Sequence, residues 1–394
     1  MPEVRPGPWL RLIAAGAAGA AALAVVSGAL LLHTAHRALA ALAVPPLAAL
    51  VAAAWVAHRR LLGPSLAALA CFLAAALVVG RPLHIALATL ALAAALVASA
   101  ATLRGKPVAA APWKDYVTLT KPRIMTLLLL TSACGMVVGA GGFPSAWVFV
   151  VTMAGLALAC GGASALNHVI DRDIDRHMRR TDRRPVAADR VAPTRALEFG
   201  LALSALSFVL LASLVNVLTA LLALAGNLFY VFVYTRWLKR STPQNIVIGG
   251  AAGAVPPLVG WAAATGNVTV PALLLFAIVF FWTPPHFWAL ALLIRRDYEA
   301  AGVPMLPVVR GERETTKQIV LYTIVLVAVT ASPFLYGTLG LPYLVAAIVL
   351  GAAFFVLALG LRREPTPRRA ALLFHFSLLY LALLFAAMAL DAAL

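Results

Sequence analysis

The sequence has little charge: only 11% of its 394 residues are Asp, Glu, Lys or Arg, whereas 63% are hydrophobic. A soluble protein of this length needs a far larger polar surface, so the composition excludes that class. Apolar runs of about 20 residues recur from one end to the other, which is the length a helix needs to cross a bilayer. A transmembrane β-barrel would show short alternating segments instead. The predicted fold class is an all-α polytopic membrane protein.

Cysteine is also scarce, and Cys71, Cys134 and Cys160 lie in apolar runs without a CxxC spacing. We expect them to be small core residues and not metal ligands or disulfide partners. No small-residue cleavage site follows the first apolar run, so this run is expected to be a retained span and not a signal peptide. The N-terminus turns hydrophobic at once, which speaks against a mitochondrial presequence and favours a bacterial plasma membrane.

Thirteen spans are predicted, at about 10–33, 36–57, 64–80, 84–103, 124–142, 146–166, 196–214, 216–235, 244–264, 271–294, 318–338, 343–361 and 371–390. With the N-terminus inside, nearly all of the 31 Lys and Arg residues fall in inside loops, and only Arg37 and Arg81 fall outside. Positive residues accumulate in cytoplasmic loops, so the net charge of +17 is mainly a topology signal. We therefore expect the lipid bilayer as a partner and no nucleic acid.

The chain divides into three predicted parts. Residues 1–103 form a four-span extension of unknown role, 104–122 a proline-containing linker that leads into the catalytic body, and 123–394 a nine-span domain. Long charged loops follow the spans 146–166 and 271–294 on the inner side, whereas the outer loops are short. Since function tends to lie on long loops carried by a rigid scaffold, these two inner loops are the predicted site.

The first inner loop begins with carboxylates at helical spacing. Asn167, Asp171 and Asp175 are placed i, i+4, i+8, which aligns them on one helical face at the membrane boundary, while Asp173 points elsewhere. Carboxylates this close repel each other unless a cation lies between them. Hard oxygen ligands suit Mg²⁺, which binds through one or two carboxylates plus substrate phosphates. The alternative is an ordinary cytoplasmic loop with compensating charges.

Basic residues follow this acidic face. They are Arg176, Arg179, Arg180, Arg183 and Arg184. Guanidinium groups match phosphate oxygens in bidentate fashion, so acids and arginines together predict a metal–diphosphate cradle. The second inner loop carries Asp297, whose carboxylate could face the first acidic site and clamp the same diphosphate through bridging metal ions.

Long stretches of the chain resemble the UbiA-type intramembrane prenyltransferases. They are Leu119–Arg123, Asn167–Pro185, Tyr234–Trp261 and Asp297–Gln318, within a resemblance that covers about 113–394. The run Asn245–Pro257 is similar to the branch of that family that modifies heme. The resemblance implies a nine-helix bundle that transfers a farnesyl group from farnesyl diphosphate to a vinyl group of heme b with Mg²⁺, giving heme O for cytochrome oxidase.

The resemblance also implies residue roles. Asn167, Asp171 and Asp175 would form the first metal–diphosphate motif, and Asp297 would begin the second. Many members have another aspartate four positions later, where this sequence has Ala301, so Glu299 is a candidate substitute. Further candidates near the diphosphate or the prenyl group are Lys121, Arg123, Arg179, Arg183, Arg184, Tyr234, Lys239 and Arg295.

Three histidines are heme candidates. His286 lies among aromatic residues in the span 271–294, where it either contacts heme or is hydrogen-bonded within the bundle. His36 and His84 are expected at the same depth and resemble half of a heme A synthase, which suggests axial heme ligation and association with that enzyme. The alternative is a purely structural four-helix extension.

Two other functions are compatible with the pattern. A quinone or chlorin precursor is the alternative acceptor within the same family, and a secondary transporter is the alternative from another class. Transporters usually place charges near the bilayer midplane, between repeats. Here the acidic residues cluster with arginines at one membrane face, which disfavours transport.

Overall fold

The computed structural model describes residues 111–394, and within them nine helices are long and apolar enough to cross a membrane. They are α6 (Pro122–Ala140), α7 (Ala146–Ile170), α9 (Pro193–Leu214), a continuous span formed by α10 (Val217–Leu228), η2 (Phe229–Leu238) and α11 (Lys239–Ser241), α12 (Asn245–Thr265), α13 (Val270–Leu293), α16 (Gly311–Leu335), α17 (Leu341–Arg363) and α18 (Pro367–Ala393). They match the last nine predicted spans. The first four predicted spans, with His36 and His84, lie outside the described residues.

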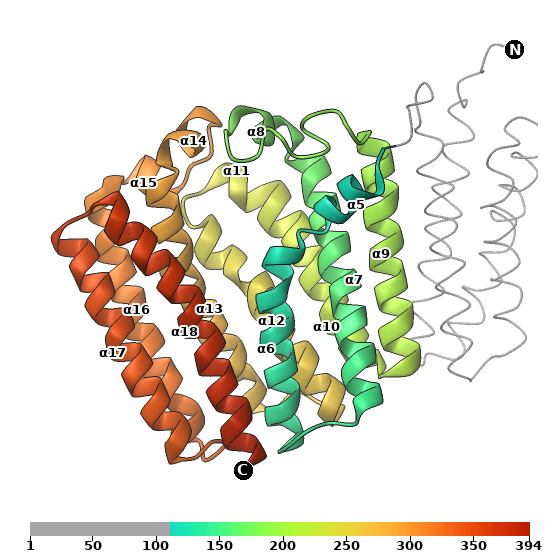
Figure 1. Cartoon of the computed structure of the whole chain (residues 1–394), viewed down its shortest axis with the longest axis vertical. Helices are drawn as coiled ribbons and strands as arrows, with labels where there is room; N and C mark the ends of the chain where they lie inside the picture. Colours follow the sequence, from blue (N-terminus) through green and yellow to red (C-terminus); the bar gives the residue numbers. More distant parts are fainter. Residues whose placement is uncertain (1–110) are drawn as a thin grey trace, which may run out of the picture.

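The two ends of this bundle differ in charge. Four short helices gather at one end, at the top of Figure 1: α5 (Trp113–Leu119), α8 (Arg172–His177), α14 (Arg295–Ala300) and α15 (Leu306–Val309). Every Lys and Arg of the described part lies at this end, and the turns at the other end carry none. The predicted alternation of long basic and short neutral loops is thus present in the fold.

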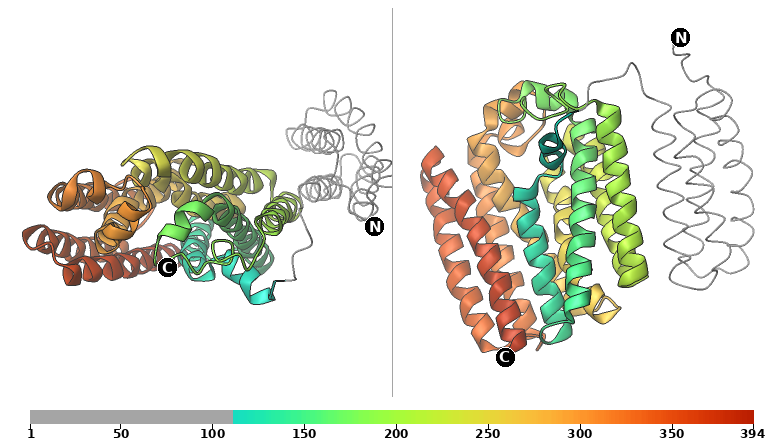
Figure 2. Two further views of the ribbon diagram at one scale, coloured as in Figure 1. Left: turned by 90° about the horizontal axis from the view of Figure 1, so that it is seen from above. Right: turned by 45° about the vertical axis from the view of Figure 1, so that its right-hand side comes forward.

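The helices form an elongated bundle in which α16, α17 and α18 lie at one side and α9 lies at the other (Figure 2). The largest buried cluster lies between α6, α12, α13 and the three C-terminal helices, and Trp288, Tyr343 and Phe354 are among its fully buried members. Exposed Leu, Val and Ile side chains on α17 point outward, as expected for a helix in contact with lipid. Close van der Waals packing of this kind holds helices together inside a bilayer, where lipid is as apolar as the side chains.

The central helices α6 and α12 approach each other closely, because a glycine on each helix lies against the backbone of the other helix. A methyl group added at Gly135 would lie 2.6 Å from the Pro257 carbonyl oxygen, and one at Gly260 would overlap the Ser132 carbonyl oxygen. Small residues at such crossings allow helix backbones to approach within membranes. The Asn245–Pro257 run is therefore in part a packing surface.

A short helix lies in the segment 104–122 that the sequence suggests as a linker. α5 begins after Pro112, and its Leu119 is buried against Val186 and Val191 of the first charged loop. The Asp115 carboxylate accepts two hydrogen bonds from Arg190 Nε, at 3.2 and 3.1 Å. These contacts attach α5 to the charged end, directly before the turn at Lys121.

Candidate active site

The predicted acidic face forms at the junction of α7 and α8. α7 ends at Ile170 and α8 begins at Arg172, so Asp171 interrupts the regular helix. The backbone ladder nevertheless continues, because Asp171 N–H donates to the Asn167 carbonyl at 2.9 Å and Asp175 N–H donates to the Asp171 carbonyl at 2.8 Å. The three side chains therefore stay on one face, and their residues are only 3%, 0% and 1% exposed in chain order.

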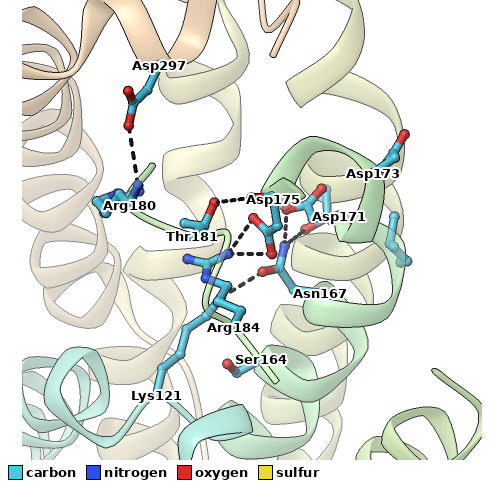
Figure 3. Close-up of polar contacts among 12 residues, drawn as sticks. Lys121, Ser164, Asn167, Asp171, Asp173, Asp175, Arg180, Thr181, Arg184 and Asp297 are labelled. Carbon is cyan, nitrogen blue, oxygen red and sulfur yellow. Dashed lines mark hydrogen bonds and ion pairs between the residues drawn. The ribbon is translucent and has the colours of Figure 1, made fainter. Parts of the chain in front are cut away.

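Asn167 is the centre of a hydrogen-bonded network (Figure 3). Its Nδ2 donates to Asp171 Oδ2 at 2.8 Å and to Thr235 Oγ1 of η2 at 3.2 Å. Its Oδ1 accepts from Lys121 Nζ at 2.7 Å. Lys121 has left-handed backbone angles, φ 50° and ψ 58°, between α5 and α6. This conformation strains the backbone of a non-glycine residue, and residues strained in this way are frequent at functional sites.

Each buried carboxylate has a basic partner. Arg184 Nη1 donates to both oxygens of Asp175, at 2.8 and 2.9 Å. Lys239 Nζ donates to Asp171 Oδ2 at 2.5 Å. Because two buried carboxylates repel each other, these cations stabilise the acidic face. Lys239 and Arg184 belong to the residues predicted near a diphosphate, and both point into the cluster.

Burial also acts on Lys121. Desolvation, with the neighbouring Arg184 guanidinium as a smaller cause, holds the pKa of the Lys121 amine well below its usual range. A nearby anion favours the charged form of such an amine. An anion beside the Lys121 amine would therefore stabilise its charged form.

The donor set fits Mg²⁺. Asp171 Oδ1 is buried and accepts no hydrogen bond within the described part of the chain, and Arg240 Nη2 lies 3.8 Å from it. An orphaned carboxylate oxygen in a protein interior is costly, and a hard cation would satisfy it. Among residues 111–394, no group of three or more His, Cys, Asp or Glu is arranged to hold a metal ion. Protein carboxylates alone would therefore not complete a Mg²⁺ shell here, and substrate phosphates and water would have to supply the remaining oxygens.

The second charged loop reaches the same end of the bundle. Asp297 Oδ2 accepts a 3.4 Å hydrogen bond from the Arg180 backbone N–H, so its carboxylate points toward the first loop (Figure 3). Tyr298 is buried beside it, and this burial raises the pKa of its hydroxyl. Glu299 is exposed. Arg295 forms a 3.6 Å ion pair with Glu312 and not with the acidic face.

The remaining predicted site residues make no hydrogen bond or ion pair with the acidic face: three arginines are exposed, and Tyr234 packs against a neighbouring helix. Arg123, Arg179 and Arg183 are exposed and form no side-chain hydrogen bond or ion pair within the described segment. Tyr234 lies on η2, stacks on Tyr230 at a centroid distance of 5.5 Å, and packs closely on Gly249. A methyl group at Gly249 would overlap the Tyr234 ring, which gives this glycine of the Asn245–Pro257 run a structural role.

His286 is enclosed within the bundle. Its ring stacks between Trp282 and Phe374, at centroid distances of 4.3 and 4.8 Å. Its Nδ1 lies 2.7 Å from Ser377 Oγ, and that hydroxyl donates its hydrogen to the Phe374 carbonyl. Ser377 must then accept from His286 Nδ1–H, which leaves Nε2 as the unprotonated nitrogen. Of the two roles expected for His286, the structure thus shows the hydrogen bond within the bundle. In this tautomer the Nε2 atom carries the free lone pair of the ring.

Sequence reasoning missed three residues that shape the site. Thr235 accepts from Asn167, Thr181 Oγ1 donates to the Asp175 carbonyl at 3.1 Å, and Arg240 Nη2 donates to the Ile170 carbonyl at 2.7 Å. Arg240 follows Lys239 in a basic stretch and could have been found by its charge. The two threonines lie in ordinary polar or apolar surroundings and carry no sequence signal.

Sequence comparison identifies a family and its named relatives. Residues 128–386 match the profile of the UbiA prenyltransferase family. The chain is 58% identical over 280 residues to a protoheme IX farnesyltransferase of Symbiobacterium thermophilum, covering 71% of this chain and 94% of that protein. It is 53% identical over 289 residues to a protoheme IX farnesyltransferase of Roseiflexus sp., covering 73% of this chain and 54% of that protein. This chain thus spans about half the length of the Roseiflexus relative.

Solved structures share the fold. A digeranylgeranylglyceryl phosphate synthase superposes with a TM-score of 0.61 at 18% identity, covering 71% of this chain and 98% of that chain. A UbiA homolog from Archaeoglobus fulgidus bound to GPP and Mg²⁺ superposes with a TM-score of 0.51 at 19% identity, covering 70% and 99%. The predicted nine-helix architecture is therefore confirmed.

Proposed function

Since the chain belongs to the UbiA prenyltransferase family, we propose that it transfers a farnesyl group from farnesyl diphosphate to a vinyl group of heme b, giving heme O. The protoheme IX farnesyltransferases to which it is 53–58% identical support this acceptor and donor. The observation that carries the chemistry is the buried Asn167–Asp171–Asp175 face with its unsatisfied Asp171 oxygen.

We infer that Asp171 and Asp175, with Asp297 from the second loop, hold Mg²⁺ and the diphosphate. When bound, Mg²⁺ takes up negative charge that develops on the departing diphosphate. Lys121, Lys239 and Arg184 already converge on the acidic face and would donate hydrogen bonds to phosphate oxygens. The exposed Arg179 and Arg183 lie on the same loop and would reach an incoming diphosphate from outside.

The group transfer would proceed as follows. The allylic C–O bond of farnesyl diphosphate breaks, and diphosphate leaves with the bonding electron pair. The vinyl group of heme forms a C–C bond to the farnesyl carbon, and water adds to the resulting cation and loses one proton to give the hydroxyl of the product chain. The bundle around η2 and α13 is apolar, which keeps water from the farnesyl group before transfer. We place His286 Nε2 as a heme contact, since its lone pair faces no hydrogen-bond donor among the residues described.

The charged end is proposed to face the cytoplasm of a bacterial cell, because every Lys and Arg of the described helices lies there. With the four preceding spans that the sequence predicts, this orientation would put the N-terminus inside, and the plasma membrane is the proposed site of action. Association with heme A synthase stays a prediction for residues 1–103.

Heme analysis in a heterologous host tests the function. Expression of the chain in cells that make only heme b should yield heme O, detected by mass spectrometry of extracted pigments. Unchanged heme b together with a prenylated quinone would contradict the heme assignment and favour the alternative acceptor. An Asp171→Asn chain expressed to the same level serves as the matched control.

A further inference from the structure

A second basic site lies on the opposite side of the α7–α8 junction from the acidic face. A recess of about 310 Å³ opens there between the ends of α7, α8, η2 and α11. Its apolar lining residues are Val169 and Ile170, and its polar lining residues are Arg172, Asp173, Arg176, Arg236 and Arg240. In Figure 3 Asp173 points away from the Asn167 cluster, so this recess opens on another side of the junction than the acidic face.

Internal ion pairs leave this recess positively charged. Arg240 pairs with Asp173 at 2.7 Å, and that hydrogen bond lowers the pKa of Asp173 to about 2. Arg172 and Arg176 share Asp189, each at 2.5 Å. Arg236 forms no hydrogen bond or ion pair through its side chain within residues 111–394. The four guanidinium groups are thus balanced by only two carboxylates, so the recess keeps a net positive charge.

Two donors in the wall of the recess lack an acceptor. The Nε atoms of Arg172 and Arg240 are buried and make no hydrogen bond in the described part of the chain. A buried N–H without an acceptor destabilises the fold. The exposed Arg236 guanidinium has no protein partner within residues 111–394, and guanidinium groups bind phosphate oxygens in bidentate fashion.

The surroundings of the recess indicate where the phosphate comes from. Leu228, Phe232 and Arg236 follow each other at four-residue intervals along the same span, and the first two are 46% and 61% exposed. Trp237, next to Arg236, is 63% exposed, and tryptophan is enriched where membrane meets water. An apolar strip of helix surface therefore leads from the bilayer up to the arginines.

We propose that this recess binds the phosphate headgroup of an anionic phospholipid, with the acyl chains lying along Phe232 and Leu228. Basic pockets at the cytoplasmic ends of transmembrane helices recognise anionic headgroups in this way. The lipid phosphate supplies the acceptor that the Arg236 guanidinium lacks and balances the excess positive charge of the recess. Arg240 also lies 3.8 Å from Asp171, so the lipid site and the acidic face share one guanidinium group.

Native mass spectrometry of the full chain tests the proposal. Released from micelles with equal amounts of phosphatidylglycerol and phosphatidylcholine, the wild type should retain phosphatidylglycerol preferentially. Arg236→Gln should lower this retention about fivefold, the effect expected of one basic residue near anionic lipid. Arg236→Lys should keep most of it. Arg368→Gln, which removes an exposed arginine at the same end outside the recess, should behave like the wild type.

Two outcomes would overturn the proposal. Equal retention of the two lipids by the wild type, or equal losses in the Arg236→Gln and Arg368→Gln chains, would remove the headgroup site. Displacement of phosphatidylglycerol by inorganic phosphate at the same concentration would assign the recess to a free anion and refute the lipid. Unchanged thermal unfolding of the variants in lipid-free detergent excludes misfolding as the cause, since Arg236 has no partner to leave unpaired.

Discussion

At the scale of single residues, the site consists of two buried ion pairs and one buried hydrogen bond from a lysine to a neutral amide. Lys239 pairs with Asp171, Arg184 pairs with Asp175, and Lys121 donates to the Asn167 side chain. Buried ion pairs contribute little net stability, because removing both charges from water costs about as much as their attraction returns. Their presence at a membrane boundary is better explained by binding of a charged substrate.

Replacement of Asp171 by Asn should abolish most turnover. The change removes a charge from the proposed metal site while keeping its volume and its hydrogen bond to Asn167. We expect heme O formation in membrane vesicles with farnesyl diphosphate and Mg²⁺ to fall about 100-fold or more.

The matched control for this variant is Asp173→Asn. Asp173 lies two residues away, is largely exposed and pairs with Arg240 outside the acidic face. Its replacement should leave turnover within about threefold of the wild type, because an exposed ion pair contributes little. Wild-type turnover in the Asp171→Asn chain would remove the metal-site assignment.

Replacement of Arg184 by Gln should destabilise the protein. It leaves the Asp175 carboxylate, whose side chain is 2% exposed, without its basic partner. Removing one member of a buried pair costs about 3–5 kcal/mol, so the thermal unfolding midpoint in detergent should drop clearly. Arg183→Gln changes an exposed neighbour and should leave the midpoint unchanged. Equal unfolding midpoints for the Arg184→Gln and Arg183→Gln chains would show that the Arg184–Asp175 ion pair does not stabilise the fold.

The sequence predicted the carboxylate row but not all of its partners. The spacing of Asn167, Asp171 and Asp175 is local, so helical periodicity sufficed to align them. Their partners come from far along the chain: Lys121 is 46 residues from Asn167, and Lys239 is 68 residues from Asp171. Lys121 and Lys239 were reached only through family resemblance, and Arg240 and Thr235 were missed because only tertiary packing brings them near.

At the scale of elements, two irregularities position the site. The helix breaks at Asp171 while its hydrogen-bond ladder continues, and the span Val217–Ser241 contains the ten-residue π-helix η2. π-helical turns are rare and frequent at functional sites. η2 carries Thr235 to Asn167 and Tyr234 to Gly249. Neither irregularity was predicted, since apolar periodicity does not distinguish α from π turns.

The nine spans of the described part, by contrast, were predicted to within a few residues at most ends. Length and hydropathy determine a transmembrane helix almost by themselves, because every backbone group must be satisfied inside the bilayer. The largest difference is α16, which begins at Gly311 and not at 318. Its first turns are charged and extend beyond the apolar core, so hydropathy alone missed them.

Gly260→Ala should disrupt the contact between α6 and α12. The added methyl group would overlap the Ser132 backbone oxygen, and backbone cannot move aside cheaply. Overpacking of this kind costs about 1–3 kcal/mol or more, so thermal unfolding in detergent should occur at lower temperature.

Gly253→Ala on the same helix is the matched control. A methyl group there meets nothing within 4 Å, and alanine favours helix, so the midpoint should stay the same or rise. Equal behaviour of the two alanine variants would contradict the close approach of these helices.

At the scale of the whole molecule, charge is separated between two ends. Lys and Arg gather where α8, α11, α14 and α15 meet, whereas the opposite end of the described part has short turns without Lys or Arg and the carboxylate of Asp391. By the positive-inside rule this separation would orient the bundle, and it would favour the binding of anionic substrates and lipids at the same face. The proposed active site and the proposed lipid recess accordingly share one end.

Cysteine labelling tests this orientation. In a chain whose native cysteines are replaced, Asn267→Cys and Gln244→Cys place thiols at opposite exposed ends of α12. A membrane-impermeant thiol reagent added to intact cells should modify Asn267→Cys and leave Gln244→Cys unmodified until the membrane is permeabilised. The reverse pattern would place the charged end outside the cell.

The most direct test is binding of farnesyl diphosphate to the purified full chain, measured by calorimetry with Mg²⁺ and again with the metal removed by a chelator. Because the phosphates need a divalent ion to approach Asp171 and Asp175, affinity should fall at least about tenfold without Mg²⁺. Equal affinity in the two conditions would show that these carboxylates do not hold the diphosphate through a metal.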